Sequence, residues 1–412
     1  MQRIGWQVLL LMKLLKKDFA IDCLGSELMT DVNNSKPVYG NPREPVPVPL
    51  ENAKELGIGQ VIDQYGEPTG TIKEPDISDV DLKRIYQAMC MTRAIDDRGW
   101  KLQRSGRIAF WIPLKGQEAI ATATTCAAMP SDWIFRSHRE LSVWLLRGKK
   151  LETMFAQFFG AVEEPLMGRR LPCLIGSREI NLISSTTQVG AYLPHAVGAA
   201  WAAKLKGASE RVICFIGDGS ASRGEFTSAL NFAGIHKPPV LIICVNNGWA
   251  VTTPLDCQTA IPNFAARGDA YGVRNLRIDG NDPLAVYSVT KEMLNTMPEQ
   301  GAALVEAITY RRGYHTSSDN PELYRMEEES KLWKVWDPIS RMKAYLTNKK
   351  LWSESDESLM NEQHQEEIQR AVDIASKLPL ADPASQFDHV FEQSNWMLDK
   401  QKERVLSELS EK

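Results

Sequence analysis

The sequence has little of several features that mark common classes of protein. Its 48 basic and 52 acidic residues give a formal net charge of -4, so it lacks the basic excess that nucleic-acid binding requires. Its seven cysteines include no C-x-x-C pair, which argues against a disulfide framework or a zinc site and favours a reducing compartment. The G-x-G-x-x-G fingerprint of dinucleotide-binding proteins is also missing. From the charge balance, we expect no nucleic-acid partner.

The sequence also offers no convincing membrane span. The amino-terminal stretch MQRIGWQVLLLMKLLKK, residues 1–17, is apolar and basic, but it is interrupted by Lys13 and is too short to cross a bilayer. A signal or transit peptide stays an alternative, although no clear small-residue cleavage site follows. We interpret residues 1–28 as an over-extended start or a removable segment, with Met29 opening the working chain, and we expect no membrane association.

The rest of the chain has the composition of a globular protein, with 412 residues of which 43% are hydrophobic and 24% are charged. Five prolines in KPVYGNPREPVPVP, residues 36–49, predict an extended arm. The cap signal SDVD predicts a helix that begins at Ser78, and the sequence after Asp337 is charged and helical. We predict three parts, namely an amino-terminal segment with the proline-rich arm (1–77), an α/β domain (78–345) and a carboxyl-terminal helical region (346–412).

The stretch RVICFIGDGSASRGEFTSALNFAGIHKPPVLIICVNN, residues 211–247, predicts one β-α-β unit. Its two strands are expected to be parallel, so that both carboxyl ends open on the same edge of a sheet. Asp218 and Asn247 follow these ends and should face one crevice, where Gly217 and Gly219 let a ligand approach the backbone. A carboxylate and an amide oxygen suit magnesium, which fills its other positions with phosphate and water. The pair therefore predicts a magnesium-diphosphate site.

A simpler interpretation of the GDG motif stays open, because short glycine motifs are weak signals and a tight strand-to-helix turn would explain it equally well. The 26 residues between GDG and NN, at positions 220–245, favour the functional interpretation. This length accommodates one helix and one strand, and it matches the spacing of the thiamine diphosphate motif.

Further motifs occur in one order along the chain and carry a resemblance to a known family. They are GQEA at 116–119, GRRLP at 168–172, LPHAVGAAWAAK at 193–204, NNGWAVTTP at 246–254, RIDGNDPLAVY at 277–287 and YRRGYHTSSDNPELYR at 310–325. With them, residues 80–345 resemble the alpha subunits of thiamine-dependent 2-oxo acid dehydrogenases, especially the branched-chain (2-oxoisovalerate) type. The resemblance implies a doubly wound, mostly parallel sheet of the thiamine diphosphate-binding fold.

The resemblance also implies roles for individual residues in holding thiamine diphosphate and Mg²⁺. The side chains of Asp218 and Asn247 and the backbone carbonyl of Trp249 would bind the metal. Gly219 and Ser220 would lie against the diphosphate, at the start of a helix where free N–H groups favour anions. Arg139 and Arg311 would add charge-assisted hydrogen bonds, although either arginine taken alone is more often a surface ion-pair partner. These assignments are expectations that follow from the resemblance.

Two departures from the family pattern lie near the same pocket. His138 stands where the family has a tyrosine before the diphosphate-binding arginine, and we still assign it to the cofactor pocket. In STTQVGAY, residues 185–192, Ala191 and Tyr192 replace the polar ligands of the family's potassium loop, so potassium is not predicted. Thr187 and Val189 of this segment are assigned to the cofactor pocket.

His315 is the predicted catalytic residue. It lies in the polar segment RRGYHTSSDNP, where a histidine is usually just solvated, yet its pKa range suits proton transfer near neutral pH. The resemblance implies that this side chain reaches the cofactor. Five matching site residues, Asp218, Asn247, Arg139, Arg311 and His315, argue against the alternative of a non-catalytic structural subunit.

The resemblance implies oxidative decarboxylation of a 2-oxo acid with transfer of the acyl group to lipoamide of an acyltransferase component. The chain has room for only one α/β unit of this kind, so a beta subunit must complete the site, in an α2β2 heterotetramer. Ile112 and Trp111, in FWIPLKGQEA, predict an apolar wall and favour branched-chain substrates over pyruvate or acetoin, unless both are simply core residues. Val245 replaces an arginine of animal members, which favours a bacterial, cytoplasmic protein; a eukaryotic source would imply the mitochondrial matrix.

Overall fold

The structure is a computed structural model that describes residues 45–162, 166–184 and 186–410. The amino-terminal segment 1–28, Met29 and the arm up to residue 44 lie outside the described residues. The end of the arm is described, and there Val48 and Leu50 are buried in a cluster that includes Trp249 and Trp333. Val48 of the arm, and Leu50 just after it, therefore pack against the chain's own core.

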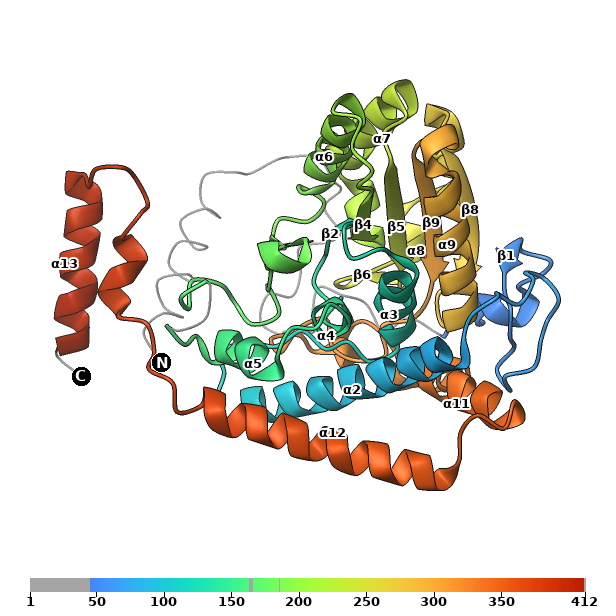
Figure 1. The fold of residues 1–412 in the computed structure, drawn as a ribbon. Coiled ribbons are helices and arrows are strands. Elements are labelled where there is room, and N and C mark those ends of the chain that lie inside the picture. Colours follow the sequence, from blue (N-terminus) through green and yellow to red (C-terminus); the bar gives the residue numbers. More distant parts are fainter. Residues whose placement is uncertain (1–44, 163–165, 185, 411–412) are drawn as a thin grey trace, which may run out of the picture. The chain divides into compact units, whose positions relative to one another are not determined.

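A seven-stranded sheet forms the centre of the described chain, with the strand order β1-β8-β9-β5-β4-β2-β3 (Figure 1). Each pair of neighbouring strands in this sheet is parallel. A separate antiparallel pair, β6 and β7, follows β5. The strands are β1 (Ile58–Gly59), β2 (Trp133–Phe135), β3 (Leu182–Ile183), β4 (Val212–Gly217), β5 (Val240–Asn246), β6 (Trp249–Ala250), β7 (Thr253–Pro254), β8 (Arg274–Asp279) and β9 (Ala303–Ile308).

Helices connect and cover these strands. They are α2 (Asp79–Arg104), α3 (Glu118–Ala127), α4 (Ser142–Leu146), α5 (Leu151–Phe159), α6 (Leu193–Leu205), α7 (Gly224–His236), α8 (Leu255–Gln258), α9 (Pro283–Gln300), α10 (Glu327–Leu332), α11 (Pro338–Asn348), α12 (Glu354–Ala375) and α13 (Trp396–Ser410). Figure 1 shows α6 and α7 on one side of the sheet, and α3 and α9 on the other.

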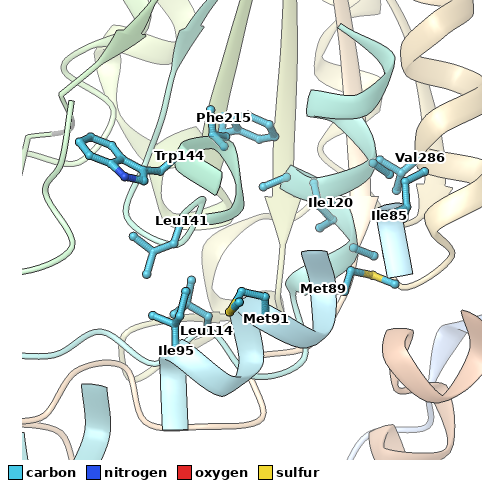
Figure 2. Packing of buried hydrophobic residues seen from close by; sticks show 14 of the residues in the cluster. Ile85, Met89, Met91, Ile95, Leu114, Ile120, Leu141, Trp144, Phe215 and Val286 are labelled. Atoms are coloured by element: carbon cyan, nitrogen blue, oxygen red, sulfur yellow. The ribbon is translucent and has the colours of Figure 1, made fainter. Parts of the chain in front are cut away.

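The central strands are apolar on both faces because both faces are covered by helices. Along β4, Ile213 and Phe215 belong to one core cluster, whereas Cys214 and Ile216 belong to the other. The first cluster joins the sheet to α2, α3 and α9, and Figure 2 shows Phe215 close to the residues of these helices. The second joins the sheet to α6 and α7. This arrangement confirms the predicted doubly wound α/β fold.

The β-α-β unit predicted from residues 211–247 is present as β4, α7 and β5, and its strands pair in parallel from Val212↔Val240 to Gly217↔Val245. The helix predicted at Ser78 is also present, and the Ser78 side chain accepts a hydrogen bond from the backbone N–H of Asp81. In the carboxyl-terminal region, α12 begins with a capping box formed by Ser353 and Asp356. The division into parts at residues 77 and 345 stays a prediction, and α11 runs across the second of these boundaries.

Two predictions of absence concern the described part of the chain. In it, no helix is long and apolar enough to cross a membrane. The six cysteines that it contains are free thiols. Cys23 lies outside the described residues.

Candidate functional site

A cavity of about 510 Å³ lies at the carboxyl ends of β4 and β5. This edge of a parallel sheet, called here the carboxyl edge, is where open α/β folds bind ligands. The residues of the predicted site gather here although they come from five separate stretches of the chain. Those that line the cavity are His138, Arg139, Thr187, Val189, Asp218, Gly219, Ser220, Asn247, Trp249 and His315.

Asp218 follows directly after β4 and is buried, with 2% of its surface exposed. Its Oδ2 atom accepts a hydrogen bond of 2.8 Å from the side-chain amide of Gln258, at the end of α8. Burial raises the pKa of the Asp218 carboxyl above its ordinary value, although this hydrogen bond acts in the opposite direction. A bound cation would stabilise the ionised carboxylate.

The other two predicted metal ligands lie in the Asn246–Trp249 turn, which follows β5. The Oδ1 atom of Asn247 accepts a hydrogen bond from the backbone N–H of Trp249 at 3.3 Å. The backbone carbonyl of Trp249 accepts one from Nη1 of Arg311 at 3.1 Å. Each predicted metal-binding oxygen is therefore hydrogen-bonded to a donor of the protein.

This set of atoms fits magnesium. A carboxylate, an amide oxygen and a carbonyl oxygen are hard ligands, and Mg²⁺ normally adds water and substrate phosphate to a few such groups. Within the described ranges, no three His, Cys, Asp or Glu side chains gather as a metal site of another kind. A buried carboxylate with an amide as its hydrogen-bond partner is a suitable place for a cation.

The backbone beside Asp218 leaves room for a ligand. A Cβ atom at Gly217 would meet no atom within 4 Å, whereas one at Gly219 would lie 2.9 Å from the Cβ atom of Ala250. Gly217 thus keeps the cavity open, and Gly219 permits close contact with β6. Gly219 and Ser220 belong to a 3-10 turn, η3 (Asp218–Ser222), that precedes α7. They were expected at the start of the helix itself.

Arg139 is a partly buried cation held by neutral acceptors. Its Nε atom donates to the carbonyl oxygen of Pro113 at 2.9 Å, and its Nη2 atom donates to that of His315 at 2.7 Å. Burial, followed by repulsion from Arg311, lowers the pKa of Arg139 to about 10. Among the described residues, its guanidinium pairs with no carboxylate. The site therefore holds a positive charge that an anionic ligand would stabilise.

Arg311 occupies a different place from the one expected. It is 1% exposed, does not line the cavity, and lies behind the Asn246–Trp249 turn. Its guanidinium donates to the carbonyl oxygens of Trp249 and Val251 and to the hydroxyl of Tyr324. In this arrangement Arg311 contacts the carbonyl assigned to the metal, so direct binding of a diphosphate requires it to turn away.

The two site histidines are neutral at pH 7. Burial, with repulsion from Arg139 and Arg136, lowers the pKa of His138 to about 4. Burial, with repulsion from Arg139 and Arg311, lowers the pKa of His315 to about 2. His138 lines the cavity and its Nε2 atom lies 3.1 Å from the carbonyl oxygen of Thr186.

The tautomer of His315 follows from its neighbour. Its Nδ1 atom lies 3.3 Å from Nη1 of Arg311, and a guanidinium can only donate. We infer that Nδ1 accepts and that the proton of the neutral ring is on Nε2. The backbone N–H of His315 donates to Asp319, which also accepts from Tyr324. These contacts hold the ring at the cavity.

One side of the cavity is apolar, as expected, but its composition differs from the prediction. Ile112 lines it, whereas Trp111 is fully buried and donates its indole N–H to Asp96. Trp111 is therefore a core residue, because its ring packs where Gly99 leaves space. The additional apolar lining residues are Phe110, Leu171, Leu174, Tyr192 and Val251.

Sequence reasoning missed Gln258, Asp319 and Tyr324. Gln258 contacts Asp218 across 40 residues of sequence, from a helix of four residues. Asp319 and Tyr324 lie within the quoted segment 310–325, yet no pattern indicated that they fix His315 and Arg311. The available signal was the clustering of polar residues in that segment.

Comparison with known proteins agrees with this geometry. A model of the family described as the dehydrogenase E1 component matches residues 86–384. The alpha subunit of mitochondrial 2-oxoisovalerate dehydrogenase from Mus musculus is 33% identical over 356 residues, which cover 86% of this chain and 80% of that protein. The Arabidopsis thaliana subunit alpha 1 is 33% identical over 370 residues, covering 89% and 78%.

The Caenorhabditis elegans subunit is 31% identical over 366 residues, covering 88% of this chain and 85% of the relative. The family match and these relatives both extend over more than two thirds of the chain. The chain therefore belongs to the dehydrogenase E1 component family.

Proposed function

We propose that this chain is the alpha subunit of a 2-oxoisovalerate dehydrogenase that depends on thiamine diphosphate and magnesium. The observation that supports this most directly is the charge arrangement at the cavity, where the buried carboxylate of Asp218 and the partly buried Arg139 face the same cavity without forming an ion pair. A metal-bound diphosphate would satisfy both groups, because its cation can bind the Asp218 carboxylate and its phosphate oxygens can accept hydrogen bonds from Arg139. The E1 match and the names of the relatives support the same assignment.

In this proposal Asp218, Asn247 and the carbonyl of Trp249 hold Mg²⁺. Arg139 binds the diphosphate directly, and Gly219 and Ser220 lie beside it in the cavity wall. His138, Thr187 and Val189 line the same cavity and contact the cofactor. Arg311 contributes after it releases the Trp249 carbonyl to the metal.

Thiamine diphosphate, when bound, supplies the nucleophilic carbon and the electron sink for decarboxylation. The chain supplies a proton donor beside it. His315 is neutral, and its inferred tautomer places a proton on Nε2 while Nδ1 accepts from Arg311. An anion bound next to Arg139 and Arg311 would raise the pKa of His315 toward the range that suits proton transfer.

The apolar side of the cavity supports a branched aliphatic substrate. Phe110, Ile112 and Leu174 present hydrocarbon where a side chain of the 2-oxo acid can be buried. Each additional buried methylene stabilises the bound substrate by about 0.8 kcal/mol. We therefore expect 2-oxoisovalerate to be preferred over pyruvate.

The chain supplies one seven-stranded sheet in its described residues. As an alpha subunit it acts with a beta subunit, and we propose an α2β2 heterotetramer in which the beta subunit completes the cavity. A lipoyl-bearing acyltransferase component receives the acyl group. The three relatives described above are named as mitochondrial. For this chain we propose the bacterial cytoplasm, or the mitochondrial matrix if its source is eukaryotic.

The test is decarboxylation by the chain co-expressed with its beta subunit, in the presence of thiamine diphosphate and magnesium. We expect turnover of 2-oxoisovalerate to exceed that of pyruvate and to disappear in the Asp218→Ala variant. A preference for pyruvate would contradict the substrate assignment. An assembled complex without turnover of either acid would indicate a non-catalytic subunit.

A further inference from the structure

We propose that Glu306 is a positioning residue for the metal, although it neither lines the cavity nor belongs to the predicted site. The inference rests on the proposed magnesium site and adds a residue that sets its affinity. Glu306 acts through Asn246, which holds the turn that carries Asn247 and Trp249. Hydrogen bonds join Glu306 to Asn246 and Asn246 to Gly248, and the chain then joins Gly248 to the two predicted metal ligands.

The first step places Glu306 behind the turn. It lies in β9, opposite Cys244 of β5 on one side and Arg277 of β8 on the other. Its side chain is fully buried. Its Oε1 atom accepts a hydrogen bond of 2.7 Å from Nδ2 of Asn246. Glu306 therefore fixes the amide group at the last position of β5.

The second step fixes the direction of the Asn246 amide. Because its nitrogen faces Glu306, its Oδ1 atom points to the turn and accepts the backbone N–H of Gly248 at 3.2 Å. Gly248 has a φ of +82°, a left-handed conformation that a tight turn requires and that glycine adopts without strain. The Asn246 side chain thus closes this turn from within.

The third step connects the turn to the predicted metal ligands. Asn247 precedes Gly248 and Trp249 follows it, so the turn sets the direction of the Asn247 side chain and of the Trp249 carbonyl. The Oδ1 atom of Asn247 and the N–H of Trp249 are joined across the same turn. A change in the Gly248 contact would therefore move two of the three metal-binding oxygens.

Only a carboxylate at position 306 satisfies this environment. Its second oxygen, Oε2, accepts the backbone N–H of Ala265 at 3.1 Å and lies 3.4 Å from Nε of Arg277. Both oxygens therefore face donors. In Glu306→Gln the new side-chain NH2 group is a donor, and it would face another donor in either orientation. It would face either the side-chain NH2 group of Asn246 or the N–H groups of Ala265 and Arg277. The first orientation turns the Asn246 amide over and removes the contact with Gly248.

The experiment measures magnesium affinity of the full chain in complex with its beta subunit. Binding of thiamine diphosphate is followed by calorimetry over a series of magnesium concentrations, so that the readout does not depend on turnover. Glu306→Gln and Asn246→Ala should each weaken magnesium binding by about 10- to 100-fold, the usual effect of removing a partner of a metal ligand. The double variant should be no weaker than the weaker single variant, because both act through one contact.

The matched control is Asp132→Asn. Asp132 is also a fully buried carboxylate that pairs with an arginine, Arg211, but it precedes β2 at the opposite edge of the sheet. It should leave magnesium affinity unchanged. Unchanged affinity in both Glu306→Gln and Asn246→Ala, with loss in Asp218→Asn, would overturn the inference and leave the proposed function intact.

Two other outcomes also decide the question. Additive losses in the double variant would show that Glu306 does not act through Asn246 and would overturn the inference. Unchanged magnesium affinity in Asp218→Asn would contradict the proposed metal site itself, and with it the role of Glu306.

Discussion

The Asp132–Arg211 pair at the amino edge of the parallel sheet and the cavity at its carboxyl edge bury charge in different ways. At the amino edge, Asp132 and Arg211 form a direct ion pair, with hydrogen bonds of 2.9 Å from Nε to Oδ1 and 2.7 Å from Nη2 to Oδ2. At the carboxyl edge, Asp218 accepts from an amide, and Arg139 donates to carbonyl oxygens. The first edge needs no ligand to satisfy its charges. The cavity holds opposite charges apart, which is the arrangement expected of a binding site, whereas elsewhere on the same edge Asp279, at the end of β8, pairs directly with Arg341 at 2.7 Å.

This contrast separates stability from function at the level of single residues. A buried ion pair that is satisfied within the chain mainly affects folding, and removal of one partner leaves an uncompensated charge. A charge that is removed from water without an ion-pair partner has a pKa displaced from its ordinary value, as Asp218 and Arg139 do. Such displaced values are typical of functional sites.

The largest expected effect is that of Asp218→Asn on catalysis. Loss of the carboxylate should reduce decarboxylation more than about 1,000-fold, because a metal clamp contributes several kcal/mol to the stabilisation of developing charge. The free energy of unfolding of the cofactor-free complex should stay the same or rise, since burial disfavours the ionised form. Steady-state rates and urea denaturation measure the two quantities. A marked loss in the free energy of unfolding would show that Asp218, like Asp132, mainly stabilises the fold.

At the amino edge the opposite result is expected from Asp132→Asn. The substitution weakens the ion pair with Arg211, so the free energy of unfolding should fall by about 3 kcal/mol. The affinity for thiamine diphosphate should stay as in the unmodified complex. Urea denaturation and calorimetry check this result. A change of tenfold or more in the affinity for thiamine diphosphate would contradict the claim that Asp132 affects folding and not binding.

Arg139→Gln should weaken thiamine diphosphate binding by about 10- to 100-fold. This is the value of one or two hydrogen bonds to a charged group, about 1.5 to 3 kcal/mol. The binding of thiamine, which has no phosphate, should change little, and the ratio of the two affinities is the decisive readout. Equal losses for both ligands would show that Arg139 does not contact the diphosphate.

The smallest expected effect concerns pH. The folded pKa of His138, about 4, lies below its ordinary value, so the unfolded chain takes up this proton first as pH falls. Above about pH 6.5 the histidine is neutral in both the folded and the unfolded chain, so His138 does not change the free energy of unfolding with pH. Between about pH 6.5 and about pH 4 only the unfolded chain binds the proton, so the free energy of unfolding falls by about 1.4 kcal/mol per pH unit. His138→Gln should reduce the pH slope of the free energy of unfolding by that amount. An unchanged slope would contradict the burial of a neutral imidazole.

The sequence predicted those parts of the fold that depend on local patterns. The apolar runs of β4 and β5, the helical spacing between them and the cap at Ser78 depend on neighbouring residues, and all are present. Parallel pairing then brought Asp218 and Asn247 to one cavity, as the crossover rule requires. This part of the site was predictable because strand ends place side chains without knowledge of the loops.

The sequence could not predict contacts that depend on the direction of loop side chains. Ile112 and Trp111 are neighbours, yet one lines the cavity and the other is a core residue. Arg311 follows the end of β9 but turns behind the wall, because Trp249, Val251 and Tyr324 offer it acceptors there. Gln258 comes from a single helical turn with no periodic signal. These positions are determined by tertiary packing.

An experimental structure of the chain with its beta subunit, thiamine diphosphate and magnesium would show whether the cavity holds the metal-bound diphosphate. We expect a cation bound by Asp218, Asn247 and the Trp249 carbonyl, with Arg139 against the diphosphate and Gln258 released from the metal-bound oxygen of Asp218. A cofactor bound elsewhere, with the hydrogen bond between Gln258 and Asp218 intact, would contradict the claim that the cavity holds its charges apart for this ligand.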